Sequence, residues 1–560
     1  MGLLKVAVAG VLFAPALAAP RSILPRAGEV YNDFASIPVT KDIKWVPCFG
    51  DLLCTNLEVP LDYKDASAGT TTIAFIKQVG GDGTGPDILF NPGESICSYL
   101  IMSNLDKGGP GGSGVEPVIA GNGKQFLGLL GGNFNFVGFD PRGVKNSGPA
   151  LTCFPDAPTS RAQAKAVKKI RTLPLRTRYF QYKAENERCS KIHANTKAKY
   201  ASTSAVAQDL KYFIEKQAVA NGKSAAQAKL WYFGGSYGTV IGTTFASLFP
   251  DRVERMILEA NQASDDYYRV DVRNDSATTD AAVGSFFKFC AQAGPGKCPF
   301  AGSSGATAEQ IEARYNNLLQ KLEKDPVVAS SLAQPYGFTI SDRDVRLFMF
   351  SKAYTPLGGF DIAAVVLTEL DAGKDTTYIA DRYPEFNGTG VYPDVISPSD
   401  DSDDDLQMIR CLDANTRYFI SSADQYVQLY EQITKASKYG GQVLALSNAP
   451  LCVGFSIVPP QSQIFAGLKI TKTAKPIFFI NGIRDPITPP THAYKNSKYF
   501  TGSAVLEIDG SGHGLANIPS LCAYGYVQQY MVNGTLPRSG TRCKADLTPI
   551  VDAPYVPSYS

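Results

Sequence analysis

The stretch Leu230-Trp231-Tyr232-Phe233-Gly234-Gly235-Ser236-Tyr237-Gly238 decides the fold of this chain. The apolar run before the glycines has the length of a strand, and residues 239–249 repeat their apolar positions at helical spacing until Pro250. A strand, a G-x-S-x-G turn and a helix form a nucleophile elbow, in which a strained turn exposes the serine hydroxyl. A bare G-x-S-x-G arises by chance in roughly a third of such chains. The flanking strand and helix therefore make Ser236 the candidate nucleophile.

A serine nucleophile needs a base and an acid, which in this arrangement follow it along the chain, each in a loop after a strand. Residues 476–481 read as a buried strand and lead into Gly482-Ile483-Arg484-Asp485-Pro486. Residues 504–508 read as the next strand and lead into Asp509-Gly510-Ser511-Gly512-His513-Gly514. Asp485 is therefore the candidate acid and His513 the candidate base.

The chain offers few alternatives to these two residues, since it has only three histidines. His193 precedes the serine among lysines and asparagine, and we expect it to be a solvated helix residue. His492 is expected near the start of the helix after the acid loop. Asp509 is the rival acid, but it lies in the same loop as the histidine.

A glycine loop after the strand at 87–90 is the candidate oxyanion loop. Such a loop before the nucleophile supplies one backbone N–H, and the residue after the serine supplies another. This predicts the Tyr237 N–H and an N–H from the Gly93/Gly109 region as oxyanion donors. A flexible glycine-rich linker is the alternative, although an apolar strand precedes the segment.

Composition narrows the class of protein. A net charge of +2 on 560 residues gives no argument for nucleic acid or an anionic membrane. Residues 1–18 combine Lys5, an apolar stretch and Ala16-Leu17-Ala18, which predicts a signal peptide and therefore a secreted, extracellular protein. No later stretch approaches the ~20 apolar residues that span a bilayer. The sequence has no repeats, no zinc spacing and no phosphate-cradling loop, so we expect neither a metal nor a cofactor. It leaves the oligomeric state open.

Eleven cysteines in a secreted chain should mostly be paired. Neighbours in sequence suggest Cys48 with Cys54, Cys153 with Cys189, Cys290 with Cys298, Cys411 with Cys452, and Cys522 with Cys543. Cys97 is left over. The candidate glycosylation sites are Asn274, Asn387 and Asn533, each in an N-x-S/T sequence.

These motifs resemble those of the secreted α/β-hydrolases of the prolyl aminopeptidase and tripeptidyl aminopeptidase group. The resemblance extends over most of the mature chain, and its more specific part is the tripeptidyl-type C-terminal region. The matching motifs include Val59-Pro60-Leu61-Asp62-Tyr63, Phe139-Asp140-Pro141-Arg142-Gly143, the elbow, Ile409-Arg410-Cys411-Leu412-Asp413, the Asp485 and His513 loops, and Gly534-Thr535-Leu536-Pro537. The chain departs at Leu258-Glu259-Ala260, where the family commonly has Leu-Asp-Gly.

The expected architecture is an α/β-hydrolase fold: a mostly parallel sheet with helices on both faces and a large, mainly helical lid inserted before the acid-bearing strand. An N-terminal extension at 19–39 precedes the core. The core would comprise 40–262 and 472–545, the latter being the tripeptidyl aminopeptidase-like region. The lid would be 263–471 and the tail 546–560. The aspartate run at 400–405 reads as a solvated loop.

Residues 94–108 interrupt the glycine loop, and we predict that they are absent from the natural mature protein. Their removal restores the family's N-P-G-G-P-G-G-S-G and leaves ten cysteines instead of eleven. Gly93-Glu94-Ser95 can also be encoded as G-GTG-AGT-C, which contains a splice-donor signal, so the segment has the features of a retained intron. A genuine insertion that forms a surface flap is the alternative.

The residues themselves indicate a serine hydrolase that acts through acyl transfer to Ser236. The resemblance implies an aminopeptidase that releases short peptides or single residues from free N-termini, with lid carboxylates binding the α-ammonium. Its partner would be a peptide or small acyl substrate. Two alternatives remain: an esterase or hydrolase of small secreted metabolites, and a non-catalytic binding protein on a hydrolase fold. A serine at the elbow disfavours an aspartate-nucleophile epoxide hydrolase or dehalogenase.

Overall fold

The computed structural model describes residues 30–93, 110–154, 173–329, 338–373, 379, 402–538 and 540–552. Several predicted features lie outside these residues: the signal peptide at 1–18, the segment 94–108 with Cys97, the oxyanion candidate Gly109 and the glycosylation candidate Asn387. The predictions on them therefore remain predictions.

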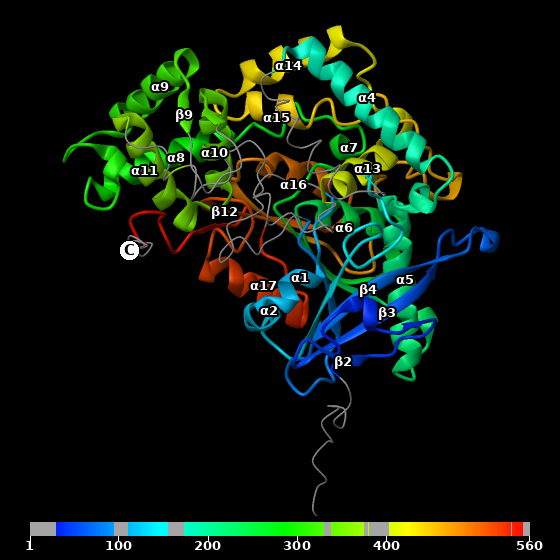
Figure 1. The fold of residues 1–560 in the computed structure, drawn as a ribbon. Helices are drawn as coiled ribbons and strands as arrows, with labels where there is room; N and C mark the ends of the chain where they lie inside the picture. The colour runs from blue at the N-terminus through cyan, green and yellow to red at the C-terminus, as the bar shows by residue number, and fades with distance from the viewer. Residues whose placement is uncertain are drawn as a thin grey trace, which may run out of the picture.

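An eleven-stranded sheet runs through the molecule in the order β1-β3-β4-β6-β5-β7-β8-β11-β12-β13, with β2 paired to β3 (Figure 1). The strands from β6 to β13 run parallel, whereas β4 is antiparallel to both β3 and β6. Their bounds are β1 Val39–Thr40, β2 Val46–Cys48, β3 Leu52–Pro60, β4 Thr70–Gln78, β5 Asp87–Asn91, β6 Asn135–Phe139, β7 Leu230–Gly235, β8 Val253–Glu259, β11 Phe478–Arg484, β12 Ala504–Ser511 and β13 Arg542–Lys544.

Helices cover both faces of this sheet, because alternate residues of each buried strand point to opposite sides. In β5, Leu89 joins the core under α5 and α6, while Ile88 and Phe90 join the core under α1 and α17. The helices of the first face are α5 Thr203–Ala220, α6 Tyr237–Leu248 and α16 Pro490–Ser497; those of the second are α1 Val115–Ile119, α2 Asn122–Leu130 and α17 Leu521–Asn533. The predicted fold class is confirmed.

A mainly helical insertion separates β8 from β11 and gathers above the sheet in two groups (Figure 1). One group packs around a core of its own and consists of α8 Thr279–Ala293, α9 Ala308–Lys324, α10 Asp342–Tyr354 and α11 Pro356–Ala372, with the short antiparallel pair β9 Val327–Ala329 and β10 Phe338–Ile340. The other elements of the insertion are α7 Ser264–Tyr267, α13 Ser402–Ala414, α14 Ala423–Ala436 and α15 Gly441–Ser447.

Helix α4, Leu175–His193, extends this insertion from an unexpected part of the sequence. It comes from the segment assigned to the hydrolase core, yet it packs against α14 (Figure 1). Asn186 donates hydrogen bonds to the carbonyls of Leu451 and Val453, both at 2.8 Å. The lid is therefore built from two separate parts of the chain.

The structure corrects the prediction that the aspartate run at 400–405 is a solvated loop. Residues 402–405 begin α13 and are not a loop, and Asp404 and Asp405 are buried. Asp404 accepts a hydrogen bond of 2.8 Å from the Cys153 N–H. The prediction of a solvated loop was wrong here because the run ends in an amphipathic helix whose first turn lies against the core.

Short 3-10 helices complete the described fold: η1 Phe34–Ser36, η2 Ala66–Ala68, η5 Lys197–Tyr200, η6 Ala225–Gln227, η7 Pro250–Arg252, η8 Pro299–Ala301, η10 Asn415–Arg417 and η11 Gln461–Gln463.

Candidate active site

Ser236 lies between β7 and α6 in a backbone conformation that L-residues rarely adopt, with φ +49° and ψ −120°. Both flanking glycines are required by close packing. A Cβ on Gly234 would lie 2.6 Å from the Gly238 carbonyl oxygen, and one on Gly238 would lie 2.2 Å from the Asn91 carbonyl oxygen. The strand, strained turn and helix predicted from the sequence are therefore present, and the turn holds the Ser236 hydroxyl at the start of α6.

Asp485 and His513 are in direct contact. The His513 Nδ1 atom lies 2.9 and 3.0 Å from the two carboxylate oxygens of Asp485. Asp485 is fully buried and accepts hydrogen bonds from the N–H groups of Ile487 and Thr488, at 3.0 and 2.9 Å. These bonds satisfy the carboxylate and fix its orientation toward the imidazole.

Two further residues hold this pair, and sequence reasoning missed both. The Thr488 hydroxyl donates to Asp485 at 2.8 Å and lies 3.2 Å from His513 Nδ1. The backbone carbonyl of Tyr354, at the end of α10, accepts a 2.9 Å hydrogen bond from the backbone N–H of His513, and the centroid of the Tyr354 ring lies 5.1 Å from that of the imidazole. Thr488 was visible as part of the acid loop, whereas Tyr354 comes from the lid and had no local signal.

Parallel strands bring these loops to one edge of the sheet. Ser236 follows β7, Asp485 follows β11 and His513 follows β12, and all three loops leave the carboxyl ends of their strands. The carboxyl ends of parallel strands are the usual place for ligands in open α/β sheets. The three residues singled out from the sequence therefore share one edge.

The alternative acid pairs with another residue, and the alternative base is buried without a hydrogen bond from its ring to the described residues. Asp509 pairs with Arg484 at 2.8 Å. His492 is buried in α16, 3.8 Å from Asp275, and burial lowers its pKa to about 4. It is therefore neutral near pH 7.

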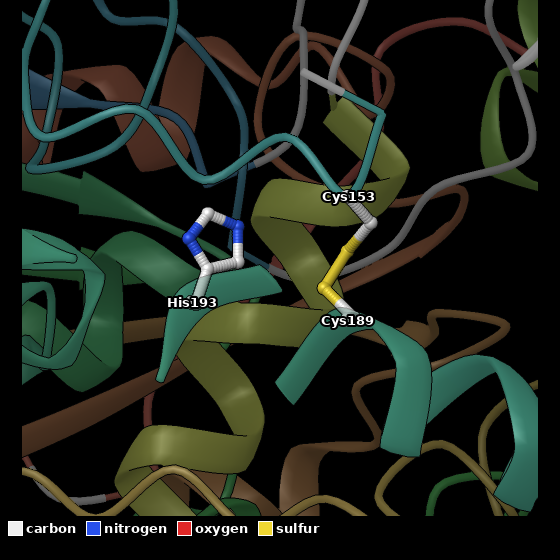
Figure 2. Close-up of side chains that lie close together, drawn as sticks. All are labelled: Cys153, Cys189 and His193. Carbon is white, nitrogen blue, oxygen red and sulfur yellow. A yellow bond between two sulfur atoms is a disulfide. The ribbon is translucent and has the colours of Figure 1, made fainter. Parts of the chain in front are cut away.

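His193 was expected to be solvated, and this prediction was wrong. The residue is buried, and its ring nitrogens lie 3.0 Å from the Thr152 carbonyl oxygen and 3.0 Å from the Thr196 hydroxyl. Figure 2 shows its ring beside the disulfide between Cys153 and Cys189. These three residues are the only cluster of potential metal ligands in the described part of the chain, but the two sulfurs are bonded to each other and do not provide thiolates.

The predicted oxyanion region is partly described. Gly93 has φ +77°, and a Cβ there would lie 2.4 Å from the Tyr237 nitrogen, so the loop passes directly over the start of α6. The Gly93 N–H donates to the Asn91 side chain at 3.0 Å. The absence of a side chain at Gly93 therefore lets the loop lie close to the elbow, while the Gly93 N–H is bonded to Asn91.

A buried carboxyl group lies beneath the serine and histidine loops. The Glu259 carboxyl accepts a 2.7 Å hydrogen bond from the Leu515 N–H, and its carbonyl accepts one of 3.1 Å from the Ser236 N–H. A Cβ on Gly235 or on Gly514 would lie 3.1 Å from its oxygens. Burial raises the pKa of Glu259 to about 7. Glu259 therefore places a titratable carboxyl group behind the site.

A pocket opens beside the serine and carries charged groups that sequence reasoning did not single out. It is lined by Ser236, Tyr237, Gln262, Tyr267, Asp275, Arg410, Asn448, Ile487 and Thr488. Asp275 and Arg410 are 2 % and 3 % exposed. Burial raises the pKa of Asp275 to about 7, against the opposing effect of the Arg410 charge. The wall of the pocket therefore presents a carboxyl and a guanidinium group.

Asp413 connects the lid to the elbow. Its carboxylate accepts hydrogen bonds from the Thr203 N–H at 2.8 Å, from the Thr203 hydroxyl and from the Tyr267 hydroxyl at 3.0 Å. The Thr203 hydroxyl in turn lies 2.8 Å from the Tyr237 hydroxyl. This network fixes the C-terminal end of α13 against the elbow. Asp413, the last residue of the motif at 409–413, therefore has a structural role.

The ten cysteines of the described residues form five disulfides with the pairing suggested by the sequence. Asn274 and Asn533 are exposed, as a glycosylation site requires. Among the described residues, none of the helices has the length and apolar character needed to cross a membrane.

Comparison with known proteins agrees with this geometry. A family model described as alpha/beta hydrolase fold matches residues 107–289, and one described as TAP-like protein matches residues 437–543. Serine protease Hip1 of Mycobacterium tuberculosis is 27% identical over 523 residues, covering 90% of this chain and 91% of the relative. Tripeptidyl aminopeptidase of Streptomyces lividans is 22% identical over 536 residues, covering 90% and 87%. Carboxylesterase B of M. tuberculosis is 23% identical over 496 residues, covering 88% and 86%.

The fold, the serine elbow and these matches define an enzyme of the serine hydrolase class. Within this class, the chain is similar to α/β-hydrolases over residues 107–289 and to TAP-like proteins over residues 437–543.

Proposed function

We propose that the protein is a secreted aminopeptidase that releases short peptides or single residues from free N-termini. The observation that carries the proposal is Asp275, a buried carboxyl group in the wall of the pocket that also contains Ser236. The names of two relatives, a serine protease and a tripeptidyl aminopeptidase, support peptide substrates.

The proposed reaction is acyl transfer through Ser236, His513 and Asp485. The serine Oγ attacks the scissile carbonyl carbon while His513 Nε2 takes the hydroxyl proton. The carbon–nitrogen bond then breaks, and His513 gives the proton to the leaving amine. Water repeats the sequence on the ester and releases the acid. Asp485 holds the imidazole through Nδ1, at 2.9 Å, and stabilises the imidazolium.

The developing oxyanion would be held by backbone donors. We assign one to the Tyr237 N–H, at the start of α6, and the other to the loop that includes Gly93 and Gly109. The Gly93 backbone lies against the Tyr237 nitrogen, but its own N–H is bonded to the Asn91 side chain, so the second donor would come from another residue of this loop. Loss of one such donor typically costs about 10²–10³ in rate.

Asp275 is suited to bind the α-ammonium of the substrate. Its Oδ1 atom accepts no hydrogen bond from the described residues, and its neighbour His492, at 3.8 Å, is neutral near pH 7 because burial lowers its pKa to about 4. A bound ammonium would favour the ionised carboxylate and would satisfy that oxygen. A substrate acetylated at its N-terminus has no ammonium group and would leave the Asp275 carboxyl group unpaired.

The test compares free and N-acetylated peptide amides, together with short-chain esters, on wild type, Asp275→Asn and Asp271→Asn. Asp271 is a matched control, because it is a buried aspartate of the same loop that pairs with Arg273 at 2.8 Å and does not line the pocket. We expect wild type and Asp271→Asn to prefer the free N-terminus, and Asp275→Asn to lose most of that preference. Indifference of wild type to acetylation would contradict the proposal.

An esterase is the second candidate function, because one relative is named a carboxylesterase. Rapid turnover of short-chain esters, combined with indifference to N-acetylation, would favour it. A non-catalytic binding protein remains the alternative of another class, and failure of a fluorophosphonate probe to label the folded wild-type protein would favour that reading.

Secretion, glycosylation and the domain boundaries are parts of the same proposal. Five disulfides suit an oxidising compartment, and two of the three candidate asparagines are exposed. We propose cleavage after Ala18 and a lid at 263–471 over a core of 40–262 and 472–545. The mechanism requires no metal and no cofactor.

A further inference from the structure

Arg410 is a buried cation in the wall of the pocket beside Ser236. It is 3 % exposed, it lines the pocket beside Ser236, and its Nε and Nη2 atoms donate no hydrogen bond to the described residues. It forms no ion pair within 4.0 Å in the described part of the chain. A guanidinium stays protonated in proteins, so this residue carries its charge into the pocket wall.

The surroundings hold Arg410 in place without neutralising it. The face of the Tyr267 ring lies 5.1 Å from the guanidinium carbon. The next residue, Cys411, is bonded to Cys452, and Asp413 fixes the same helix against Thr203. The side chain is therefore preorganised, and burial of its Nε and Nη2 atoms without hydrogen bonds to the described residues is unfavourable for a charged group.

The donors of the pocket match an anion. Besides the two guanidinium nitrogens, the Gln262 Nε2 atom is buried in the pocket wall without a hydrogen bond within 3.5 Å among the described residues, and its amide favours the ionised form of the neighbouring Asp275. A carboxylate accepts from such donors with both oxygens, and arginine binds it in a planar, bidentate manner. The one acid of the pocket, Asp275, lies beyond ion-pair distance from Arg410 in the described structure.

We propose that Arg410 selects a carboxylate on the residue whose carbonyl group is attacked, so that the preferred acyl residue is glutamate or aspartate. This inference rests on the proposed function, in which Asp275 binds the α-ammonium of the same acyl part. In a single-residue substrate, the pocket wall then offers one group to each charge of the acidic residue: Asp275 to the ammonium and Arg410 to the side-chain carboxylate. In a tripeptide, the ammonium is on the first residue and the carboxylate on the third.

The test uses fluorogenic amides that differ only in this residue, with Glu, Gln, Asp, Asn or Leu, as single residues and as the third residue of tripeptides. Glutamine is the neutral isostere of glutamate. We expect wild type to prefer Glu over Gln by about 10- to 100-fold in kcat/KM. In Arg410→Met this ratio should fall to near or below one. Fluorophosphonate labelling of the variant verifies that its site is folded.

A binding measurement gives a second readout that does not depend on turnover. In Ser236→Ala, free L-glutamate should raise the melting temperature more than L-glutamine does, and the additional Arg410→Met change should abolish the difference. Without ligand, Arg410→Met should melt at the same or a higher temperature, because a buried unpaired charge is removed.

The outcomes separate the two proposals. A preference for free N-termini with equal rates on Glu and Gln would overturn the role of Arg410 and leave the aminopeptidase standing. Ester turnover without discrimination of acetylated peptides would overturn the aminopeptidase itself. A large loss of stability in ligand-free Arg410→Met would assign the side chain to packing and would also overturn the inference.

Discussion

The substitution Glu259→Gln tests whether the buried carboxyl group beneath the site titrates near neutral pH. Glutamine keeps the shape of the side chain and a carbonyl oxygen that can accept the Leu515 N–H, at present 2.7 Å away. It removes the ionisation. Any cost of the new amide group is the same at every pH, so the pH-dependent part of the effect on stability isolates the titration.

The size of this pH-dependent effect on stability follows from the shift in the pKa of Glu259. Burial raises the pKa of Glu259 from 4.5 to about 7 in the folded protein. For an acid whose pKa is raised by folding, the folded state holds more protons, so stability falls as pH rises from about 4.5 toward about 7 and then stays low. At 1.36 kcal/mol per pKa unit, the penalty is about 1 kcal/mol at pH 5 and about 3 kcal/mol at pH 8. Relative to wild type, Glu259→Gln should therefore gain about 2 kcal/mol of stability between pH 5 and pH 8.

The assay is urea unfolding of both proteins at pH 5 and pH 8, with disulfides intact and tryptophan fluorescence as the signal. Glu323→Gln, on the exposed face of α9, is the control for the substitution itself. Its effect on the free energy of unfolding should be equal at the two pH values. If Glu259→Gln and wild type differ by the same free energy of unfolding at pH 5 and at pH 8, Glu259 does not titrate as proposed.

The remaining predictions concern the acid, one disulfide and the interrupted glycine loop. Asp485→Asn should lower kcat by about 10⁴ with little change in melting temperature, because the imidazole loses its tautomer partner; a loss below tenfold, measured on the substrate preferred by wild type, would remove Asp485 from that role. Replacing Cys411 and Cys452 by serine opens a connection with a sequence separation of 41, and the loop-entropy relation gives a loss of about 4 kcal/mol, measured by urea unfolding. An effect below about 1 kcal/mol would contradict it. Deleting residues 94–108 should yield the better catalyst; a tryptic peptide spanning Glu94 to Lys107 from active secreted enzyme would rule out the retained intron.

The fold and the positions of the three candidate residues after their strands were predictable because their signals are local. Each residue comes just after an apolar run of strand length, and parallel strands bring the ends of such runs to one edge. The position of Ser236 also depends on two neighbouring glycines, which the sequence displays directly. The disulfides were suggested in the same way, by proximity along the chain.

The charged pocket was not predictable, because it is made by tertiary packing. Asp275 precedes α8 and Arg410 lies in α13, so nothing in either segment indicates that both side chains line a pocket with the serine. Tyr354 reaches the histidine loop from the lid for the same reason. Glu259 was noticed as a departure, but its raised pKa depends on complete burial, which a single strand does not reveal.

The prediction for His193 failed for a related reason. Its neighbours in sequence are polar, but in a helix the residue four positions earlier shares its face, and that residue is the buried Cys189. Composition around a residue is therefore a weaker guide to burial than its helical partners. The aspartate run misled in the same way, since Asp404 and Asp405 lie on the inner side of α13.

The most direct test of the proposed nucleophile is covalent labelling of the folded protein with a fluorophosphonate probe, followed by mass spectrometry to locate the adduct. The account predicts one adduct, on Ser236, in wild type, no labelling of Ser236→Ala, and strongly reduced labelling of His513→Ala. Folded wild-type protein that remains unlabelled, or an adduct on another residue, would contradict the assignment of Ser236 as the nucleophile.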